Sequence, residues 1–271
     1  MKDWQKEVNL YSKDDLNYIF EINKNSKIKE KISNNHKVLI IDGIYKRPEL
    51  VQKYLLKSNF HNEDQMRKNK KTNLVGFRSF TRVPKNIEII NFLRNLLVEK
   101  FGVDDNDIDK NSFRRFIFNL YGYFDSIKNI KSNYHPHFDQ AFAATIFLNP
   151  NEECRGGTAF YRNKIHDVHD LNDISALSSL VNIDPFDWFR EMMMNEVSIS
   201  SIEDNVIIGS DDRWELLEII PMKYNRMILY NGMRFHNPYI ESEWFRDYYR
   251  ISQQFFFTIH TNEAYKNNKL F

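Results

Sequence analysis

The chain has 271 residues, a formal net charge of +1, and 42% hydrophobic and 15% aromatic residues. That much apolar material can build the core of one large domain. Because a net charge near zero creates no overall field that attracts polyanions, neither nucleic acid nor an anionic membrane is expected as a partner.

The first third of the chain predicts a strand followed by two helices. The apolar run KVLIIDGIY (37–45) predicts a strand that ends in an Asp-Gly turn. KRPELVQKYLLKSNF (46–60) predicts a helix with Pro48 in its first turn. NIEIINFLRNLLVEKFG (86–102) predicts a second, amphipathic helix that stops at Gly102.

From about residue 112 the pattern changes to short strands separated by turns. The predicted strands are SFRRFIFNLYGYF (112–124), AFAATIFLNP (141–150), TAFYR (158–162), two within EIIPMKYNRMILYNG (218–232), and YYRISQQFFFTIH (248–260). This succession predicts a mainly β fold with flanking helices (α+β), built on a double-stranded β-helix core of the jelly-roll or cupin-like type.

Two parts of one compact domain are expected. Residues 1–111 form a mixed, largely helical support region that packs on the β core of residues 112–271. Residues 164–213 interrupt the strands as a helical insertion, in which DPFDWFREMMMNEV (184–197) predicts a helix. That helix either covers a site as a lid or packs on the outside of the β core.

The stretch NYHPHFDQ (133–140) contains a candidate metal-binding pair, His137 and Asp139. On an extended strand these two residues point to the same face, so imidazole and carboxylate converge. His236, just past a predicted strand, is the candidate third ligand. Two histidines and one carboxylate make the facial triad of non-heme Fe(II) oxygenases, which leaves coordination positions open for a co-substrate and oxygen.

His135 and Cys154 are not predicted to be metal ligands. His135 lies on the same face by alternation, but Pro136 removes a ladder donor, so the strand is expected to settle after it. His135 is therefore assigned to the rim of the site. A closed structural zinc site would need a fourth ligand, and Cys154 is not obviously placed to supply it.

The final predicted strand carries Arg250 and Ser252 on one face. An arginine directed into a β core is costly unless it pairs with an anion. Because a guanidinium beside a hydroxyl is well shaped to hold a carboxylate, this pair is a candidate anion site.

The order His137-x-Asp139, His236, Arg250-x-Ser252 resembles the Fe(II)- and 2-oxoglutarate-dependent dioxygenases. The surroundings are similar to the prolyl-hydroxylase-like branch: a Tyr-bearing strand, TIFLNP, GGTAF, a Pro-containing hairpin before the distal histidine, and the opening VLIIDGIYKRPELVQKYL. Prolyl hydroxylases of this branch usually carry lysine where Arg250 stands, so the resemblance does not imply a prolyl substrate.

The resemblance, which covers roughly residues 112–260, implies a role for each of these residues. His137, Asp139 and His236 would hold Fe(II), and Arg250 with Ser252 would bind the far carboxylate of 2-oxoglutarate. O2 would be the second co-substrate. Further residues expected to line the co-substrate pocket are Asn119 and Tyr121, which match an Asn-x-Tyr pattern of some relatives, and Thr145; Tyr123 is an alternative to Tyr121, and core packing is an alternative role for both tyrosines.

The implied reaction is hydroxylation of an unactivated C–H bond in an amino acid, a peptide or a small natural product, with succinate and CO2 as co-products. Iron halogenases of this fold typically have Gly or Ala at the carboxylate position, so Asp139 favours hydroxylation. Arg155, Arg213 and Arg234 can contact an anionic substrate or simply carry surface charge. The alternative function is a cupin-like metal-binding protein or metal-dependent isomerase that does not use 2-oxoglutarate, for which Arg250 has no predicted use.

The expected location is the cytoplasm. One cysteine excludes an internal disulfide and suits a reducing compartment. The N-terminus MKDWQKEVNLYSKDDLNYIF lacks an apolar signal core. No apolar run approaches the length that spans a bilayer.

Overall fold

A computed structural model describes residues 11–33, 36–62, 77–82, 87–110, 112, 115–121, 136–139, 141–180, 209–241 and 244–260. Three features of the sequence lie outside these residues: His135, Tyr123 and the predicted helix 184–197. No helix among the described residues is long and apolar enough to cross a membrane.

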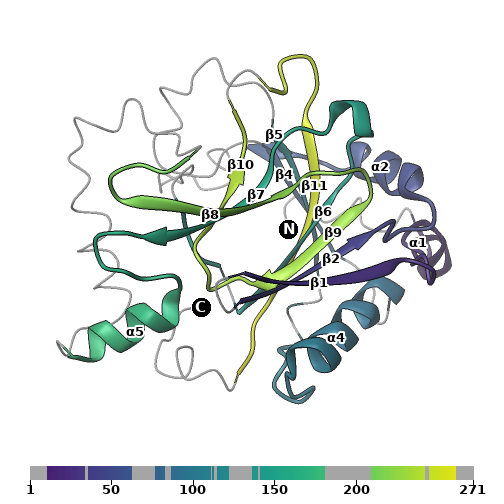
Figure 1. Cartoon of the computed structure of the whole chain (residues 1–271). Helices are drawn as coiled ribbons and strands as arrows, with labels where there is room; N and C mark the ends of the chain where they lie inside the picture. Colours follow the sequence, from purple (N-terminus) through teal and green to yellow (C-terminus); the bar gives the residue numbers. More distant parts are fainter. Residues whose placement is uncertain are drawn as a thin grey trace.

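Most of the described chain folds into two antiparallel sheets (Figure 1). Among these residues the larger sheet has eight strands in the order β1-β2-β9-β6-β11-β5-β4-β3, and the smaller has three in the order β10-β7-β8. The larger sheet contains β1 (Lys27–Ser33), β2 (His36–Asp42), β3 (His61–Asn62), β4 (Phe77–Arg82), β5 (Arg115–Tyr121), β6 (Phe142–Phe147), β9 (Arg226–Asn231) and β11 (Arg250–Phe257). The smaller contains β7 (Gly157–Asn163), β8 (Trp214–Pro221) and β10 (His236–Tyr239).

The helices of the described residues are α1 (Lys13–Ile19), α2 (Pro48–Leu56), α4 (Glu88–Phe101) and α5 (Leu171–Leu180), with a short 3-10 turn at Asn151–Glu153. Their ends follow local rules. Ser12 and Asp15 form a capping box at the start of α1. Pro48 begins α2. Gly102 ends α4 with a left-handed φ of 69°.

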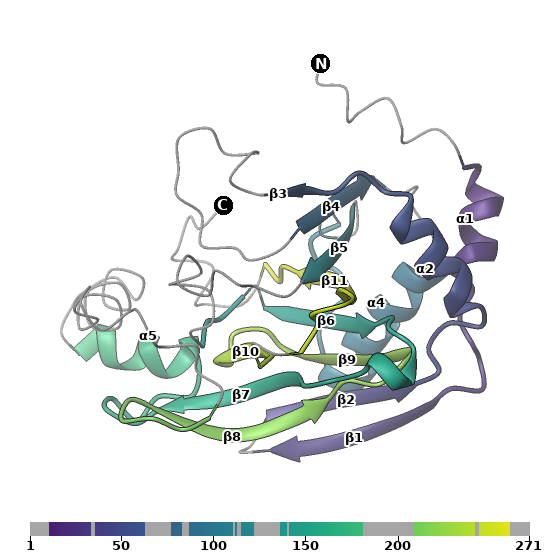
Figure 2. The same ribbon diagram turned by 90° about the horizontal axis from the view of Figure 1, so that it is seen from above.

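Three groups of buried apolar residues hold these layers together. The helix-side cluster joins α1, α2 and α4 to one face of the larger sheet, as with Val51, Leu93 and Phe118. The inter-sheet cluster fills the space between the two sheets with residues such as Phe147 and Phe160. The outer cluster packs α5 against the other face of the smaller sheet. Seen from above in Figure 2, α5 lies on the opposite side of the molecule from α1, α2 and α4.

The mainly β fold with flanking helices is confirmed. Along the chain, β7 ends at Asn163 and β8 begins at Trp214. The residues before 112 contribute more strand than expected. They supply β1 and β2 at one edge of the larger sheet and β4 and β3 at the other.

Asp42 ties the end of β2 to the start of β9 and gives the fold a predictable response to acid. Its carboxylate accepts hydrogen bonds from Arg226 Nε at 2.6 Å and from Lys223 Nζ at 2.9 Å. The Arg226 hydrogen bond, assisted by Lys223, outweighs partial burial and lowers the pKa of Asp42 to about 2. The carboxylate is therefore ionised and paired throughout the neutral range.

We expect Asp42→Asn to lower the free energy of unfolding near neutral pH by about 1 kcal/mol or less, because the Asp42 side chain is 40% exposed and solvent screens the pair. The stabilisation from a lowered folded-state pKa is complete above the unfolded value of about 3.9, so the difference should shrink as pH falls from about 4 toward 2. Urea unfolding of both proteins at several pH values measures this. The exposed Asp212→Asn is the control, and a pH-independent difference would contradict the assignment.

Candidate metal centre

The backbone brings the two predicted ligand segments side by side. The N–H of His137 donates to the carbonyl of His236 at 3.0 Å, and the N–H of His236 donates to the carbonyl of His137 at 2.8 Å. The N–H of Asp139 donates to the carbonyl of Gly232 at 2.7 Å. Residues far apart in sequence are thus held together by main-chain hydrogen bonds.

The expectation that His137 and Asp139 lie on a regular strand is wrong in detail. The pairing at His137 is an isolated antiparallel bridge, and β6 begins only at Phe142. Pro136 has no N–H to extend a ladder in the N-terminal direction. Convergence of the two side chains therefore depends on the bridge to His236 and not on strand alternation alone.

His236 is the most enclosed of the three ligands, with 3% of its surface exposed. Its Nδ1 lies 2.8 Å from the carbonyl oxygen of Arg234, and its Nε2 lies 3.1 Å from Asp139 Oδ2. A carbonyl can only accept, so Nδ1 carries a proton and donates it. Nε2 can donate to Asp139 when the ring is protonated, and its lone pair faces the centre of the triad when the ring is neutral.

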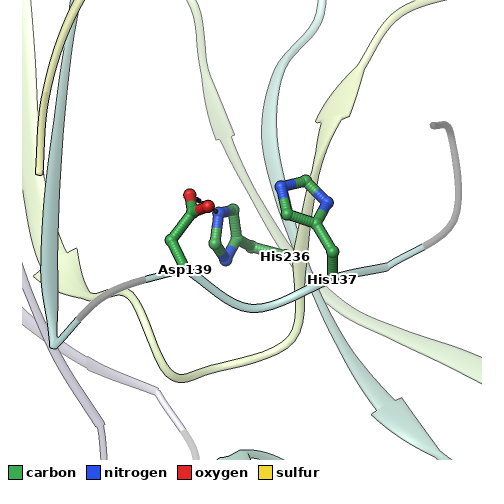
Figure 3. A group of neighbouring side chains, drawn as sticks. All are labelled: His137, Asp139 and His236. Atoms are coloured by element: carbon green, nitrogen blue, oxygen red, sulfur yellow. Dashed lines mark hydrogen bonds and ion pairs between the residues drawn. The ribbon is translucent and has the colours of Figure 1, made fainter. Parts of the chain in front are cut away.

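The three side chains form a compact donor set. One ligand atom from each of His137, Asp139 and His236 lies within 4.8 Å of the other two. Figure 3 shows the carboxylate of Asp139 directed at the ring of His236, with His137 on the same side of the chain. Two imidazole nitrogens and one carboxylate oxygen suit Fe(II), Mn(II) or Zn(II). Cys154 is not part of this set, since its thiol lies 3.4 Å from the carbonyl of Asn149.

Asp139 is held in the form that binds a metal. Burial acts to raise the pKa of its carboxyl group, but the hydrogen bond with His236 and the positive charge of His236, His137 and Arg78 outweigh burial. The pKa of Asp139 is therefore below its ordinary value. No proton has to leave this carboxylate when a cation binds at neutral pH.

The predicted co-substrate residues share one face of the larger sheet. On β11, Ile251 and Phe255 belong to the helix-side cluster, so alternation turns Arg250 and Ser252 toward the smaller sheet. The register pairs Ser252 with Asn119 on β5 and with Phe147 on β6, and pairs Gln254 with Thr145.

Asn119 and Thr145 face the same way, because their chain neighbours Phe118, Leu120, Ala144 and Ile146 all pack in the helix-side cluster. The backbone of Tyr121 pairs with Arg250 in the same register.

Arg250 is fully buried, with 1% of its surface exposed. Its Nη2 lies 3.4 Å from the carbonyl of Gly157, and its Cζ lies 5.1 Å from the centre of the Phe147 ring. Beside it, the hydroxyl of Ser252 and both polar atoms of the Asn119 amide are buried without a hydrogen-bond partner among the described residues. Such groups normally find a partner in water or a ligand, so this face is suited to a polar molecule.

Several residues near the triad were not singled out from the sequence. Arg78 on β4 pairs with Asn119, so it shares the face of the predicted pocket residues and contributes to the low pKa of Asp139. The ring of Tyr230 lies 5.0 Å from that of His236. The alternation in FRSFTR (77–82) is a strand signal, but no local signal places that strand next to β5.

The three arginines considered for an anionic substrate differ in burial. Arg155 is exposed and Arg213 is partly exposed, as surface charge would be. Arg234 is 1% exposed, so a surface role is wrong for this residue. Burial lowers the pKa of Arg234 to about 10, against the opposing effect of Glu218 and Asp170, and its guanidinium stays charged at neutral pH.

Comparison with known proteins gives one match that covers most of the chain. The sequence model of a family of unknown function, DUF6445, matches residues 24–247. The matched range contains all three ligands of the triad and ends before Arg250. A search of curated proteins finds no match.

Proposed function

We propose that this chain, which belongs to the DUF6445 family, is a non-heme Fe(II)- and 2-oxoglutarate-dependent dioxygenase. The observation that carries the proposal is the convergence of His137, Asp139 and His236 on one point. A facial set of two nitrogens and one oxygen is typical of non-heme Fe(II) oxygenases. The most suitable reaction is hydroxylation of an unactivated C–H bond in an amino acid, a peptide or a small natural product.

We also propose that the two sheets form a double-stranded β-helix. The antiparallel pairing of every strand and the shared inter-sheet cluster support this interpretation. The triad lies where the segment before β6 meets the start of β10, so one ligand segment leads into each sheet. This is the kind of position in which a ligand can enter between the sheets.

One set of residues is suited to bind the metal, and a different set is suited to bind the co-substrate. His137, Asp139 and His236 would hold Fe(II), with Nδ1 of His236 anchored on the Arg234 carbonyl to orient the ring. Arg250 and Ser252 would bind the far carboxylate of 2-oxoglutarate, and Asn119, Thr145 and Tyr121 would line the same pocket. The chemistry that the bound iron and 2-oxoglutarate supply is oxidative decarboxylation to succinate and CO2, coupled to hydroxylation of the substrate by O2.

The buried guanidinium of Arg250 supports this choice over a metal site that uses no co-substrate. Its Nη2 lies near the Gly157 carbonyl and its Cζ near the Phe147 ring, and the Ser252 hydroxyl beside it is buried without a hydrogen-bond partner among the described residues. A buried positive charge is costly unless an anion compensates for it. The planar guanidinium of Arg250, next to the Ser252 hydroxyl, is suited to bind a carboxylate through two hydrogen bonds.

Aerobic incubation of the purified protein with Fe(II) and 2-oxoglutarate tests the proposal. We expect slow succinate formation without added substrate, lost in His137→Ala and in Arg250→Ala. Under anaerobic conditions, chelation of Fe(II) by 2-oxoglutarate should give a visible charge-transfer band. Succinate formation unaffected by Arg250→Ala would overturn the co-substrate assignment. Absence of both succinate and the band would favour a metal-binding protein or isomerase that does not use 2-oxoglutarate.

A further inference from the structure

Arg234 points into the same inter-sheet space as His236. The residue between them, Phe235, packs in the outer cluster on the far side of the smaller sheet. Alternation along an extended chain therefore turns Arg234 and His236 to the opposite, inner side. The guanidinium confirms this direction, because its Cζ lies 4.2 Å from the centre of the Phe160 ring, which belongs to the inter-sheet cluster.

The guanidinium lies close to the metal centre. The rings of Phe160 and Tyr230 are 5.1 Å apart, and the rings of Tyr230 and His236 are 5.0 Å apart. The register also pairs Phe160 directly with His236 across β7 and β10. Arg234 thus contacts the ring that stands beside a metal ligand.

The hydrogen-bonding groups of Arg234 are incompletely used by the protein. The residue is 1% exposed, yet neither Nη1 nor Nη2 has a hydrogen-bond partner among the described residues. Burying a charged group without hydrogen bonds is energetically unfavourable. Two parallel N–H donors in this position are suited to a carboxylate ligand.

The nearby carboxylates have partners of their own. Glu218 forms an ion pair with Lys31. Asp170 Oδ1 accepts hydrogen bonds from the N–H groups of Asn172 at 2.8 Å and Asp173 at 3.1 Å, and Asp170 Oδ2 lies 3.7 Å from His36 Nε2.

These two acids favour a charged Arg234 from a distance without hydrogen-bonding its Nη atoms. Their negative field opposes a dianion such as a phosphate ester. The same field opposes a singly charged carboxylate less strongly, so a carboxylate fits this environment better than a dianion.

Arg234 and Arg250 form separate subsites. Arg250 contacts the carbonyl of Gly157, whereas Arg234 lies over Phe160, three residues along β7, which corresponds to roughly 10 Å. The two guanidinium groups therefore contact different parts of β7. If Arg250 binds the co-substrate, the second guanidinium is left for another ligand.

We propose that Arg234 binds a carboxylate of the substrate, and that the substrate is a small molecule with a free carboxylate, such as an amino acid. The proposal that this molecule is the substrate of the reaction rests on the dioxygenase function proposed above. Because Arg234 and His236 are two residues apart, roughly 7 Å along an extended chain, the reacting carbon would lie within a few bonds of the carboxylate. A residue inside a long peptide has no free α-carboxylate.

Equilibrium binding without turnover tests this inference. Wild-type protein loaded with Mn(II) and 2-oxoglutarate is titrated anaerobically by calorimetry with the common L-amino acids and with the corresponding amides, which lack the carboxylate. We expect at least one acid to bind at least about tenfold more tightly than its amide. Arg234→Met should weaken binding of that acid by about tenfold or more and leave the amide unchanged, and Arg234→Lys should fall between.

The controls separate folding, metal binding and the proposed reaction. Arg155→Met makes the same change on an exposed arginine and should retain the preference for the acid. Mn(II) affinity and circular dichroism of Arg234→Met should match the wild type. The inference is overturned if no acid is preferred over its amide, or if Arg234→Met weakens both equally. If no succinate forms but the acid still binds more tightly than its amide in an Arg234-dependent way, only the proposed oxygenase reaction is overturned.

Discussion

Replacing His236 by alanine is expected to lower the affinity for divalent metal by at least about a hundredfold, since even residues that only support a ligand commonly cost 10–100-fold. His236 supplies the most buried nitrogen of the triad, and its ring orientation is fixed at both nitrogens, by the Arg234 carbonyl and by Asp139. Titration of the metal-free protein with Mn(II) or Zn(II), followed by calorimetry, measures the change.

Thermal unfolding gives an independent readout of the same site. Metal at about a hundred times its Kd stabilises a folded protein by about 2.7 kcal/mol, which raises Tm by roughly 5–10 °C in a domain of this size. We expect that increase in the wild type and not in His236→Ala. His260→Ala is the matched control, because the side chain of His260 is 62% exposed and lies near Asp109. A His236→Ala protein that keeps wild-type metal affinity would show that the triad is not the metal site.

Replacing Arg250 by methionine is expected to weaken 2-oxoglutarate binding by about a hundredfold, or about 2.7 kcal/mol. Methionine preserves much of the buried volume against Phe147 but cannot donate two hydrogen bonds to a carboxylate. Arg250→Lys retains the charge without the planar fork, so an intermediate loss is expected. Anaerobic titration of the Fe(II) protein with 2-oxoglutarate measures each affinity.

The effect of Arg250→Met should be confined to the co-substrate. Its affinity for Mn(II) should equal that of the wild type, which distinguishes it from His236→Ala. Arg246→Met changes an exposed arginine four residues earlier and should leave 2-oxoglutarate binding intact. Unchanged 2-oxoglutarate affinity in Arg250→Met would leave Arg78 and Arg234 as the remaining arginines near the triad and would require the two carboxylate subsites to be reassigned.

Much of the fold was predictable because local signals were strong. The apolar run ending at Asp42, the periodicity before Gly102, and the β-branched and aromatic residues of β5, β6 and β11 each matched an observed element. Strands with weak signals were missed. The sequence of β1 is KIKEKIS, in which lysines dominate, and β10 is only HNPY and contains a proline. These segments become strands because they pair with β2 and β7, and their amino-acid composition alone does not predict a strand.

The candidate site was predictable as a set of ligands but not as an environment. The spacing of His137 and Asp139 and the order of His236 and Arg250 depend on chemistry that the sequence displays directly. The burial of Arg234 could not be predicted in this way, because the sequence MRF (233–235) in a turn resembles that of many exposed turns. Its inward direction follows from Phe235 packing in the outer cluster, a contact that only the assembled sheets create. The place of Arg78 next to Asn119 is likewise a matter of strand order.

The reciprocal main-chain hydrogen bonds between His137 and His236 have a consequence for the order of events in folding. Joining two points so far apart in the chain carries a loop-closure entropy cost, which the hydrogen bonds of the sheets and their apolar clusters offset without help from a cation. In small zinc-dependent domains the cation itself drives folding, and its removal unfolds the chain. Here the ligands are assembled by the backbone in advance. A bound ion should therefore exchange with solution while the rest of the chain keeps its native structure.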